Sequence, residues 1–216
     1  MTDNILYQIA LWLLPLVFAI VFHEVAHGWT AYAFGDPTAK EARRLSLNPL
    51  RHVDPIGTVV LPLILAVAHG PIFGWAKPVP VRAERLRNPR VQMMLVGLAG
   101  PGMNFLLAIL SAMLLGPGVI TSDFLQQMLV NFIAVNLFLG LFNLLPIPPF
   151  DGSHIVAGLL PDRLARPYRQ LGRWSMLIFF TLLLILPTVF KVNIVSAIVM
   201  PPFMALLRLL GVITGA

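Results

Sequence analysis

Long runs of apolar residues without charge constrain the fold of this chain more than any other feature. A helix needs roughly 20 apolar residues to cross the hydrocarbon core of a bilayer. The run from Ile5 to Phe34 supplies them, interrupted only by a short polar cluster. Further long apolar runs extend from Val91 to Leu115, from Phe124 to Leu145 and from Trp174 to Phe190. The sequence therefore predicts a multi-pass helical membrane protein.

Two further apolar segments are less regular. The segment from Val192 to Ile213 is a candidate fifth span, which we expect to break at Pro201-Pro202 because proline removes a helical hydrogen bond. The stretch from Ile56 to Ala76 carries no formal charge, but its glycines and prolines argue against a plain helix. We predict a re-entrant or short β element there, which needs protein or a water-filled cavity to cover its backbone. The expected fold is therefore all-α, with about five to six transmembrane segments.

The basic residues predict how the chain is oriented. A net charge of +6 is compatible with nucleic-acid binding, but the basic residues lie in short stretches between apolar segments, as in cytoplasmic loops of membrane proteins. If the stretch from Ile56 to Ala76 enters and leaves on one side, all of the 15 basic residues except Lys191 and Arg208 lie on that side. We therefore predict cytoplasmic basic loops, a bilayer as the surroundings and no nucleic-acid partner.

The polar cluster inside the first span, His23-Glu24-Val25-Ala26-His27, is the strongest chemical signal. Two imidazoles four residues apart on a helix project from one face and can bind the same metal. Glu24 lies beside them, where it can act as a general base. The alternative is a pair of hydrogen-bonded core histidines, but a glutamate between two histidines in an apolar span is costly unless it has a function. The cluster therefore predicts a metal site.

A third metal ligand must come from elsewhere, because a catalytic zinc usually takes three protein ligands and keeps one position for water. The chain has no cysteine, so the ligand must offer nitrogen or oxygen. Asp151 is the best candidate, because prolines before it prevent a continuous helix; the alternative is a turn residue before Gly152. Asp54 is a rival, although an aspartate before proline commonly fixes a turn. For His154 we expect a solvated role or one beside the ligands.

Three asparagines interrupt the apolar spans. Asn136 and Asn143 are seven residues apart and share a helical face, with Gly140 between them. Asn104 follows the sequence Gly100-Pro101-Gly102-Met103. Each asparagine can line the active cavity and contact a substrate backbone, or form an interhelical hydrogen bond between packed spans. The sequence favours neither role.

In these motifs the chain resembles the site-2 protease family of intramembrane zinc metalloproteases. That family shares an HExxH helix, a distal Asn-x-x-Pro-x-x-x-Leu-Asp-Gly motif and a core of three spans. The motifs here are His23–His27 and Asn143–Gly152, with Phe150 where the family usually has leucine. The resemblance extends from about Phe18 to Ile155 and is closest to compact prokaryotic members without a PDZ or nucleotide-binding domain. We therefore expect residues 1–216 to form a single integral-membrane domain built around a three-span catalytic core.

The resemblance also implies roles for individual residues. The zinc ligands would be His23, His27 and Asp151, with one Zn²⁺ per chain. Glu24 would be the catalytic base, Asn143 a cavity residue near the substrate, and Asn104 part of the family's middle-span motif. The implied activity is a metalloendopeptidase of the cell membrane that cleaves transmembrane segments of membrane proteins, as in regulated intramembrane proteolysis. The alternative is a metal transporter or sensor without hydrolytic activity, and the oligomeric state is left open.

Overall fold

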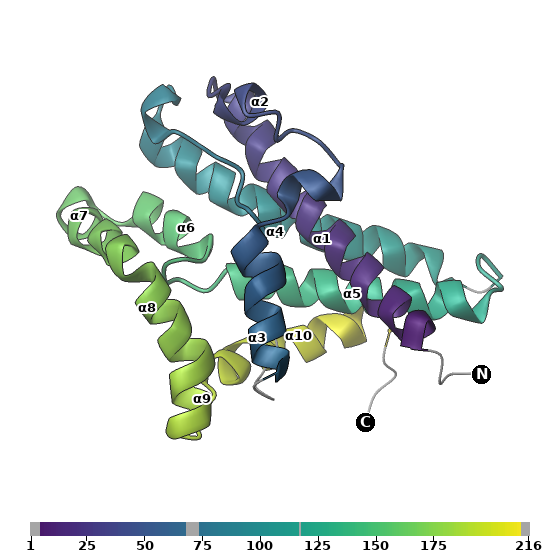
Figure 1. The fold of residues 1–216 in the computed structure, drawn as a ribbon. Helices are drawn as coiled ribbons and strands as arrows, with labels where there is room; N and C mark the ends of the chain where they lie inside the picture. Colours follow the sequence, from purple (N-terminus) through teal and green to yellow (C-terminus); the bar gives the residue numbers. More distant parts are fainter. Residues whose placement is uncertain (1–4, 68–73, 117, 213–216) are drawn as a thin grey trace.

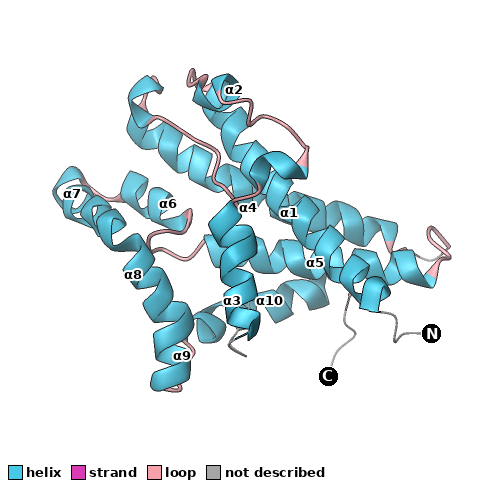
Figure 2. Ribbon diagram, in the orientation of Figure 1, coloured by secondary structure: helices cyan, strands magenta, loops and turns pink. Residues whose placement is uncertain are grey.

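A computed structural model describes residues 5–67, 74–116 and 118–212. Within these ranges the chain is mostly helical and contains no β-strand (Figure 2). The α-helices are α1 (Ile5–Ala33), α2 (Thr38–Glu41), α3 (Leu61–Val67), α4 (Pro89–Leu114), α5 (Asp123–Asn143), α6 (Gly152–Leu159), α7 (Asp162–Gln170), α8 (Ser175–Phe180), α9 (Leu186–Val189) and α10 (Ile194–Leu209). Short 3-10 turns cover Pro49–His52, Ala83–Arg85 and Leu171–Trp174, and π-helical turns cover Pro55–Val60 and Thr181–Ile185.

Helices α1, α4 and α5 pack against one another and form the centre of the molecule (Figure 1). Helix α4 begins with Pro89, which suits a first helical position because the N–H that proline lacks has no intrahelical partner there. Ala108 of α4 packs with Ile133 and Leu137 of α5, and Leu207 of α10 completes this buried cluster. Helix α6 lies against α4, so the segment after α5 returns to the three-helix centre.

Four helices within the described ranges are long and apolar enough to cross a membrane. They are Leu6–Ala33, Pro89–Leu114, Asp123–Asn143 and Asp162–Val189. Large apolar side chains are exposed along them, as expected for surfaces that face lipid, for example Trp12, Leu16, Leu106, Ile109, Met176 and Leu177. The predicted all-helical fold with several spans of membrane-crossing length is therefore confirmed for the described residues. The last span begins earlier than the predicted run from Trp174, because α7, α8, α9 and the turns between them form one continuous helical stretch.

The predicted break at Pro201-Pro202 is wrong. Both prolines lie inside α10, which is continuous over its 16 residues. Buried Val195 and Val199 pack α10 onto a second apolar cluster, and α10 also lies against α5. We attribute the continuity to this packing, which offsets the hydrogen bonds that the two prolines remove.

The stretch from Ile56 to Ala76 is more helical than the sequence indicated. A π-helical turn over Pro55–Val60 leads directly into α3, and residues 68–73 lie outside the described ranges. Asp54 caps this element, since its Oδ1 accepts hydrogen bonds from the N–H groups of Ile56 at 3.0 Å and Gly57 at 2.7 Å. This is the turn-fixing role that was the alternative to metal binding. The described part of this stretch contains no β-strand, so the predicted β element is not seen there. The re-entrant path through the membrane stays a prediction.

Asp36 fastens the extended segment before α4 to the end of α1. Its side chain is fully buried and accepts hydrogen bonds from the Thr38 N–H at 3.0 Å, the Thr38 hydroxyl and the Arg82 N–H at 2.6 Å. Burial raises the pKa of Asp36, but the hydrogen bonds from Thr38 and Arg82 outweigh it and hold the pKa below its usual value. The carboxylate form therefore stabilises the folded chain.

We predict that Asp36→Ala lowers the free energy of unfolding by about 2–4 kcal/mol, because it leaves buried N–H groups without an acceptor. The exposed Asp123→Ala serves as the control. The pKa is lower in the folded than in the unfolded chain, so the stabilisation is present above about pH 4 and is lost as the pH falls below it. The difference in thermal unfolding between the wild type and Asp36→Asn should therefore narrow in acid. A difference independent of pH would contradict the assignment.

Candidate metal centre

Three side chains from two distant parts of the chain meet at one point. Helix α1 carries His23 and His27, and the turn between α5 and α6 carries Asp151. The Nε2 atoms of the histidines lie 3.0 Å apart, and they lie 3.1 Å and 3.2 Å from Oδ2 of Asp151. Both histidines are buried, and their ligand atoms and that of Asp151 all lie within 4.8 Å of one another. The structure thus brings together the three residues that the sequence predicted as ligands.

The second nitrogen of each imidazole has its own acceptor. Nδ1 of His23 lies 2.6 Å from Oδ1 of Asn104, and Nδ1 of His27 lies 2.7 Å from the carbonyl oxygen of Val96. We therefore assign the ring proton of each histidine to Nδ1, which donates, and a lone pair to each Nε2. These lone pairs point toward a buried carboxylate oxygen, Asp151 Oδ2, that accepts no hydrogen bond. Three electron-rich atoms at this distance repel one another unless a metal cation or a proton lies between them.

The group fits a zinc ion in ligand type and spacing. Ligand atoms about 2.1 Å from a tetrahedral zinc lie about 3.4 Å apart. The observed separations of 3.0–3.2 Å are close to this value. Two imidazole nitrogens and one carboxylate oxygen also match a catalytic zinc site with three protein ligands. The residues present are therefore suited to hold Zn²⁺.

Gly100 of α4 leaves room for the histidines. A Cβ at this position would lie 2.4 Å from Nε2 of His27 and 2.6 Å from Nε2 of His23. Any larger residue would therefore occupy the space where the ligand atoms converge. In the sequence, Gly100 is notable only as part of the pattern before Asn104. The available signal was a glycine one helical turn from a polar residue, which is typical of close helix contact.

The break after α5 positions Asp151. Helix α5 ends at Asn143 and α6 begins at Gly152, so the predicted interruption is confirmed. Gly152 is required at the return, because a Cβ there would lie 2.2 Å from the carbonyl oxygen of Leu144. Phe150, the departure from the family motif, is buried, and its ring centroid is 4.6 Å from that of Phe142. The larger side chain therefore packs beside Asp151 without taking a ligand position.

Two of the predicted asparagines form a network behind His23. Asn104 and Asn136 are both fully buried. The Nδ2 group of Asn104 donates to the Ala19 carbonyl at 3.2 Å and to Oδ1 of Asn136 at 2.8 Å, and Asn136 in turn donates to the carbonyl of Phe132 at 2.8 Å. These bonds join α1, α4 and α5. Their effect is to fix the amide whose oxygen faces His23.

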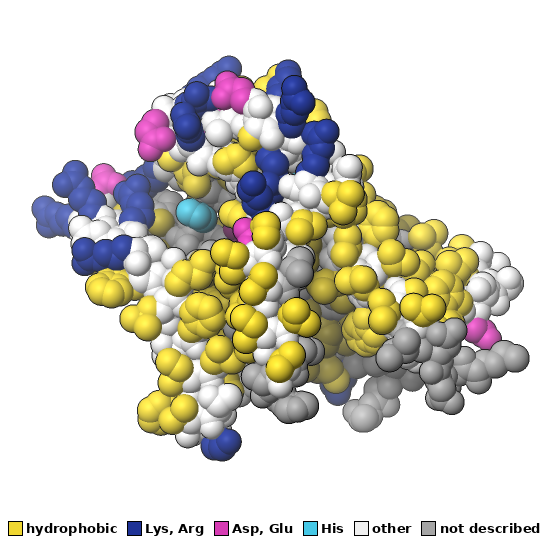
Figure 3. All heavy atoms as spheres, in the orientation of Figure 1, with side chains coloured by type: hydrophobic (Ala, Val, Ile, Leu, Met, Phe, Trp, Pro, Cys, Tyr) yellow, Lys and Arg dark blue, Asp and Glu magenta, His cyan; other side chains and the backbone are white. Residues whose placement is uncertain are grey.

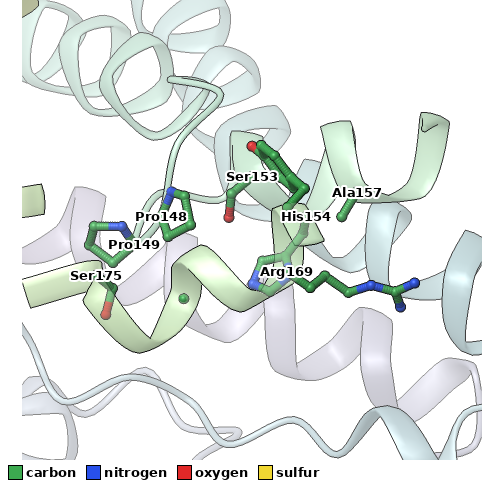
Figure 4. Close-up of a pocket in the computed structure, with 9 residues that line it drawn as sticks. Pro148, Pro149, Ser153, His154, Ala157, Arg169 and Ser175 are labelled. Atoms are coloured by element: carbon green, nitrogen blue, oxygen red, sulfur yellow. The ribbon is translucent and has the colours of Figure 1, made fainter. Parts of the chain in front are cut away.

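The other predicted residues lie around this centre. Asn143 is half-buried and donates to the Leu139 carbonyl at 3.0 Å, so its contact with a substrate stays a prediction. Oε2 of Glu24 accepts a hydrogen bond from the Val79 N–H at 2.7 Å. His154 lies outside the ligand group and lines a separate pocket of about 220 Å³ (Figure 4). Its neighbours there include Ser153 and Arg169.

Comparison with known proteins agrees with this chemistry. Residues 116–186 match the model of peptidase family M50. The chain is 38% identical over 180 residues to the Bacillus subtilis protein named "Putative zinc metalloprotease YwhC", and the alignment covers 78% of each chain. The chain belongs to peptidase family M50.

Mycobacterial relatives of this M50 chain carry the same description under the name Rip2. The chain is 33% identical over 183 residues to the protein of Mycolicibacterium smegmatis, covering 82% of this chain and 66% of the relative. It is 33% identical over 187 residues to the protein of Mycobacterium tuberculosis, covering 83% and 67%. No solved structure matches the chain significantly. The M50 match includes α5 and Asp151, whereas the two histidines precede it.

We predict that Gly100→Ala weakens zinc binding by this M50 protein at least about tenfold, because the added methyl group displaces the imidazoles. Gly102→Ala on the same helix is the matched control, since its Cβ would meet nothing within 4 Å. Metal analysis of both purified variants, with their thermal unfolding, tests this. Equal zinc content in the two variants would show that α4 does not border the metal site.

Asn104→Leu should weaken zinc binding about 10–100-fold, because His23 loses the acceptor that fixes its tautomer. Asn131 provides a control of the same kind: it is buried, donates to the Leu11 carbonyl at 2.9 Å and is absent from the network behind His23. Zinc affinity measured by competition with a chelator should fall for Asn104→Leu only. A similar fall for Asn131→Leu would indicate a general packing defect.

Proposed function

We propose that this protein is an integral-membrane zinc metalloprotease that hydrolyses peptide bonds in transmembrane segments of other membrane proteins. The observation that carries the proposal is the meeting of two imidazole lone pairs with an unpaired carboxylate oxygen, between helices apolar enough to cross a membrane. The M50 family and relatives named as zinc metalloproteases favour hydrolysis over metal transport or sensing.

Each residue of the centre has a chemical role in this proposal. His23, His27 and Asp151 would hold one zinc ion, which when bound polarises a peptide carbonyl and lowers the pKa of water. Glu24 acts as the general base: it accepts the proton of the attacking water and returns it to the leaving amine. Asn104 and the Val96 carbonyl keep the imidazoles in the tautomer that ligation requires.

The substrate must present an extended backbone. A helix holds its carbonyls in internal hydrogen bonds, so a transmembrane substrate has to unwind locally before it can be cut. We assign Asn143, half-buried at the end of α5, as the asparagine that contacts this backbone in the cavity. Asn104 and Asn136 border the cavity through their hydrogen bonds to the ligand His23 and to each other.

The proposed topology places the basic loops in the cytoplasm of a prokaryotic cell. Figure 3 shows Lys and Arg side chains gathered at the end of the molecule that carries α2 and α7, with apolar side chains over most of the remaining face. Such an asymmetry supports a cytoplasmic basic end. We infer five to six membrane segments in one domain over residues 1–216, with α10 and a re-entrant Pro55–Val67 added to the four long helices. Water would reach Glu24 from the basic end.

We predict that Glu24→Gln lowers peptide cleavage about 10²–10⁴-fold while zinc content is unchanged, because the amide cannot take up a proton. Glu84→Gln, outside the site, is the control. For each purified variant in proteoliposomes, we would measure the bound zinc and the zinc transported across the vesicle membrane. Membrane proteomes of cells with either variant show which single-span protein accumulates uncut. Full cleavage by Glu24→Gln, or zinc flux without any cleavage by the wild type, would contradict the proposal.

A further inference from the structure

The segment Lys77-Pro78-Val79-Pro80-Val81-Arg82, here called the strap, lies in extended form against the last turns of α1. Hydrogen bonds fasten it at both ends. At the first end the Lys77 N–H donates to the carbonyl of His52 at 2.9 Å, and the Arg44 guanidinium donates to the carbonyl of Lys77. At the other end the Arg82 N–H donates to Asp36 at 2.6 Å. Between these anchors the strap reaches the side chain of Glu24.

The strap presents a single backbone donor to Glu24. Pro78 and Pro80 have no N–H group, so Val79 carries the sole backbone donor of this three-residue run. That N–H lies 2.7 Å from Oε2 of Glu24. Prolines on both sides also fix φ and favour the extended form, which limits how far the donor can turn away. The bond uses one of the two carboxylate oxygens, and the other stays available for chemistry.

Packing and charge hold Val79 in place. Its side chain is buried beside Gly28 of α1, where an added Cβ would lie 2.9 Å from Cγ1 of Val79. Arg44, the anchor of the strap, is also buried. Burial lowers the pKa of Arg44, and the Glu24 carboxylate opposes this shift. The buried guanidinium therefore holds the strap in place through the carbonyl of Lys77.

We propose that the Val79 N–H is a positioning group for Glu24, and that Arg44 keeps it in position by fixing the strap at Lys77. The positioning role rests on the proposed function, because it matters only if Glu24 is the general base. An oriented carboxylate meets the attacking water in one geometry, whereas a displacement near 1 Å can cost about 100-fold in rate. The strap thus contributes to the reaction through its hydrogen bond to Glu24.

Hydrogen exchange tests the contact without any need for activity. Overlapping peptides of the purified zinc-loaded protein report Val79 alone within Pro78-Val79-Pro80, because neither proline has an exchangeable amide. We expect Glu24→Ala to speed exchange at Val79 at least about tenfold, whereas Glu24→Gln, which keeps an acceptor, should retain part of the protection. Glu84→Ala is the control for a lost carboxylate. Equally fast exchange in the wild type and in Glu24→Ala would overturn the proposal.

Kinetics test the positioning role. Val79→Pro removes the donor, and we expect kcat to fall about 10–100-fold with KM and zinc content close to wild type. Val79→Ala keeps the N–H and should lose much less. Val81→Pro adds a proline where the described residues offer the N–H no partner, and it should behave as wild type. Arg44→Lys keeps a charged donor for the carbonyl of Lys77, so its kcat should be higher than that of Arg44→Ala.

The possible outcomes distinguish failure of the positioning role from failure of the proposed protease function. An unchanged kcat in Val79→Pro, or an equal loss in Val79→Pro and Val79→Ala, would refute the positioning role. Loss of zinc from Val79→Pro would also refute it, since the N–H would then support the metal site and not Glu24. Absence of zinc-dependent cleavage by the wild type would refute the proposed function and the positioning role with it. In that case the exchange measurement would still decide the contact.

Discussion

The convergence of two imidazole lone pairs and a carboxylate oxygen is the interaction on which the rest of this structure depends. Such a group is costly in a protein interior, because Oδ2 of the carboxylate is buried away from water and accepts no hydrogen bond. A divalent cation removes that cost by supplying the positive charge that all three atoms face. The surrounding helices are arranged to bring the three atoms to one point from two distant parts of the chain.

The three central helices divide this task. Helix α1 supplies two candidate ligands at helical spacing, and α4 orients both of them through the side chain of Asn104 and the carbonyl of Val96. Gly100 lets α4 approach the imidazoles closely. Helix α5 supports Asn104 through Asn136 and then ends, so that the turn after it delivers Asp151. Between apolar helices these hydrogen bonds supply geometric specificity that hydrophobic burial alone does not give.

The sequence predicted the long spans and the ligand group because local rules determine them. Helical spacing fixes His23 and His27 on one face, and the prolines after Asn143 end the helix before Asp151. The features that the sequence did not predict depend on tertiary packing. Helix α10 continues through Pro201-Pro202 because buried side chains hold it. The contact from Val79 to Glu24 joins residues far apart in sequence, and no periodic pattern signals it. Likewise, the spacing of Asn136 and Asn143 indicated that they share a helical face, but it did not indicate that Asn136 accepts a hydrogen bond from Asn104.

X-ray absorption at the zinc edge tests the central claim most directly, because it reads the ligands of the metal in the purified protein. The account predicts one zinc per chain with two imidazole ligands and oxygen at about 2.0–2.2 Å. It also predicts that zinc is lost, or its shell altered, when Asp151 is replaced by alanine. A spectrum without imidazole scattering, or an identical spectrum and zinc content in Asp151→Ala, would contradict it.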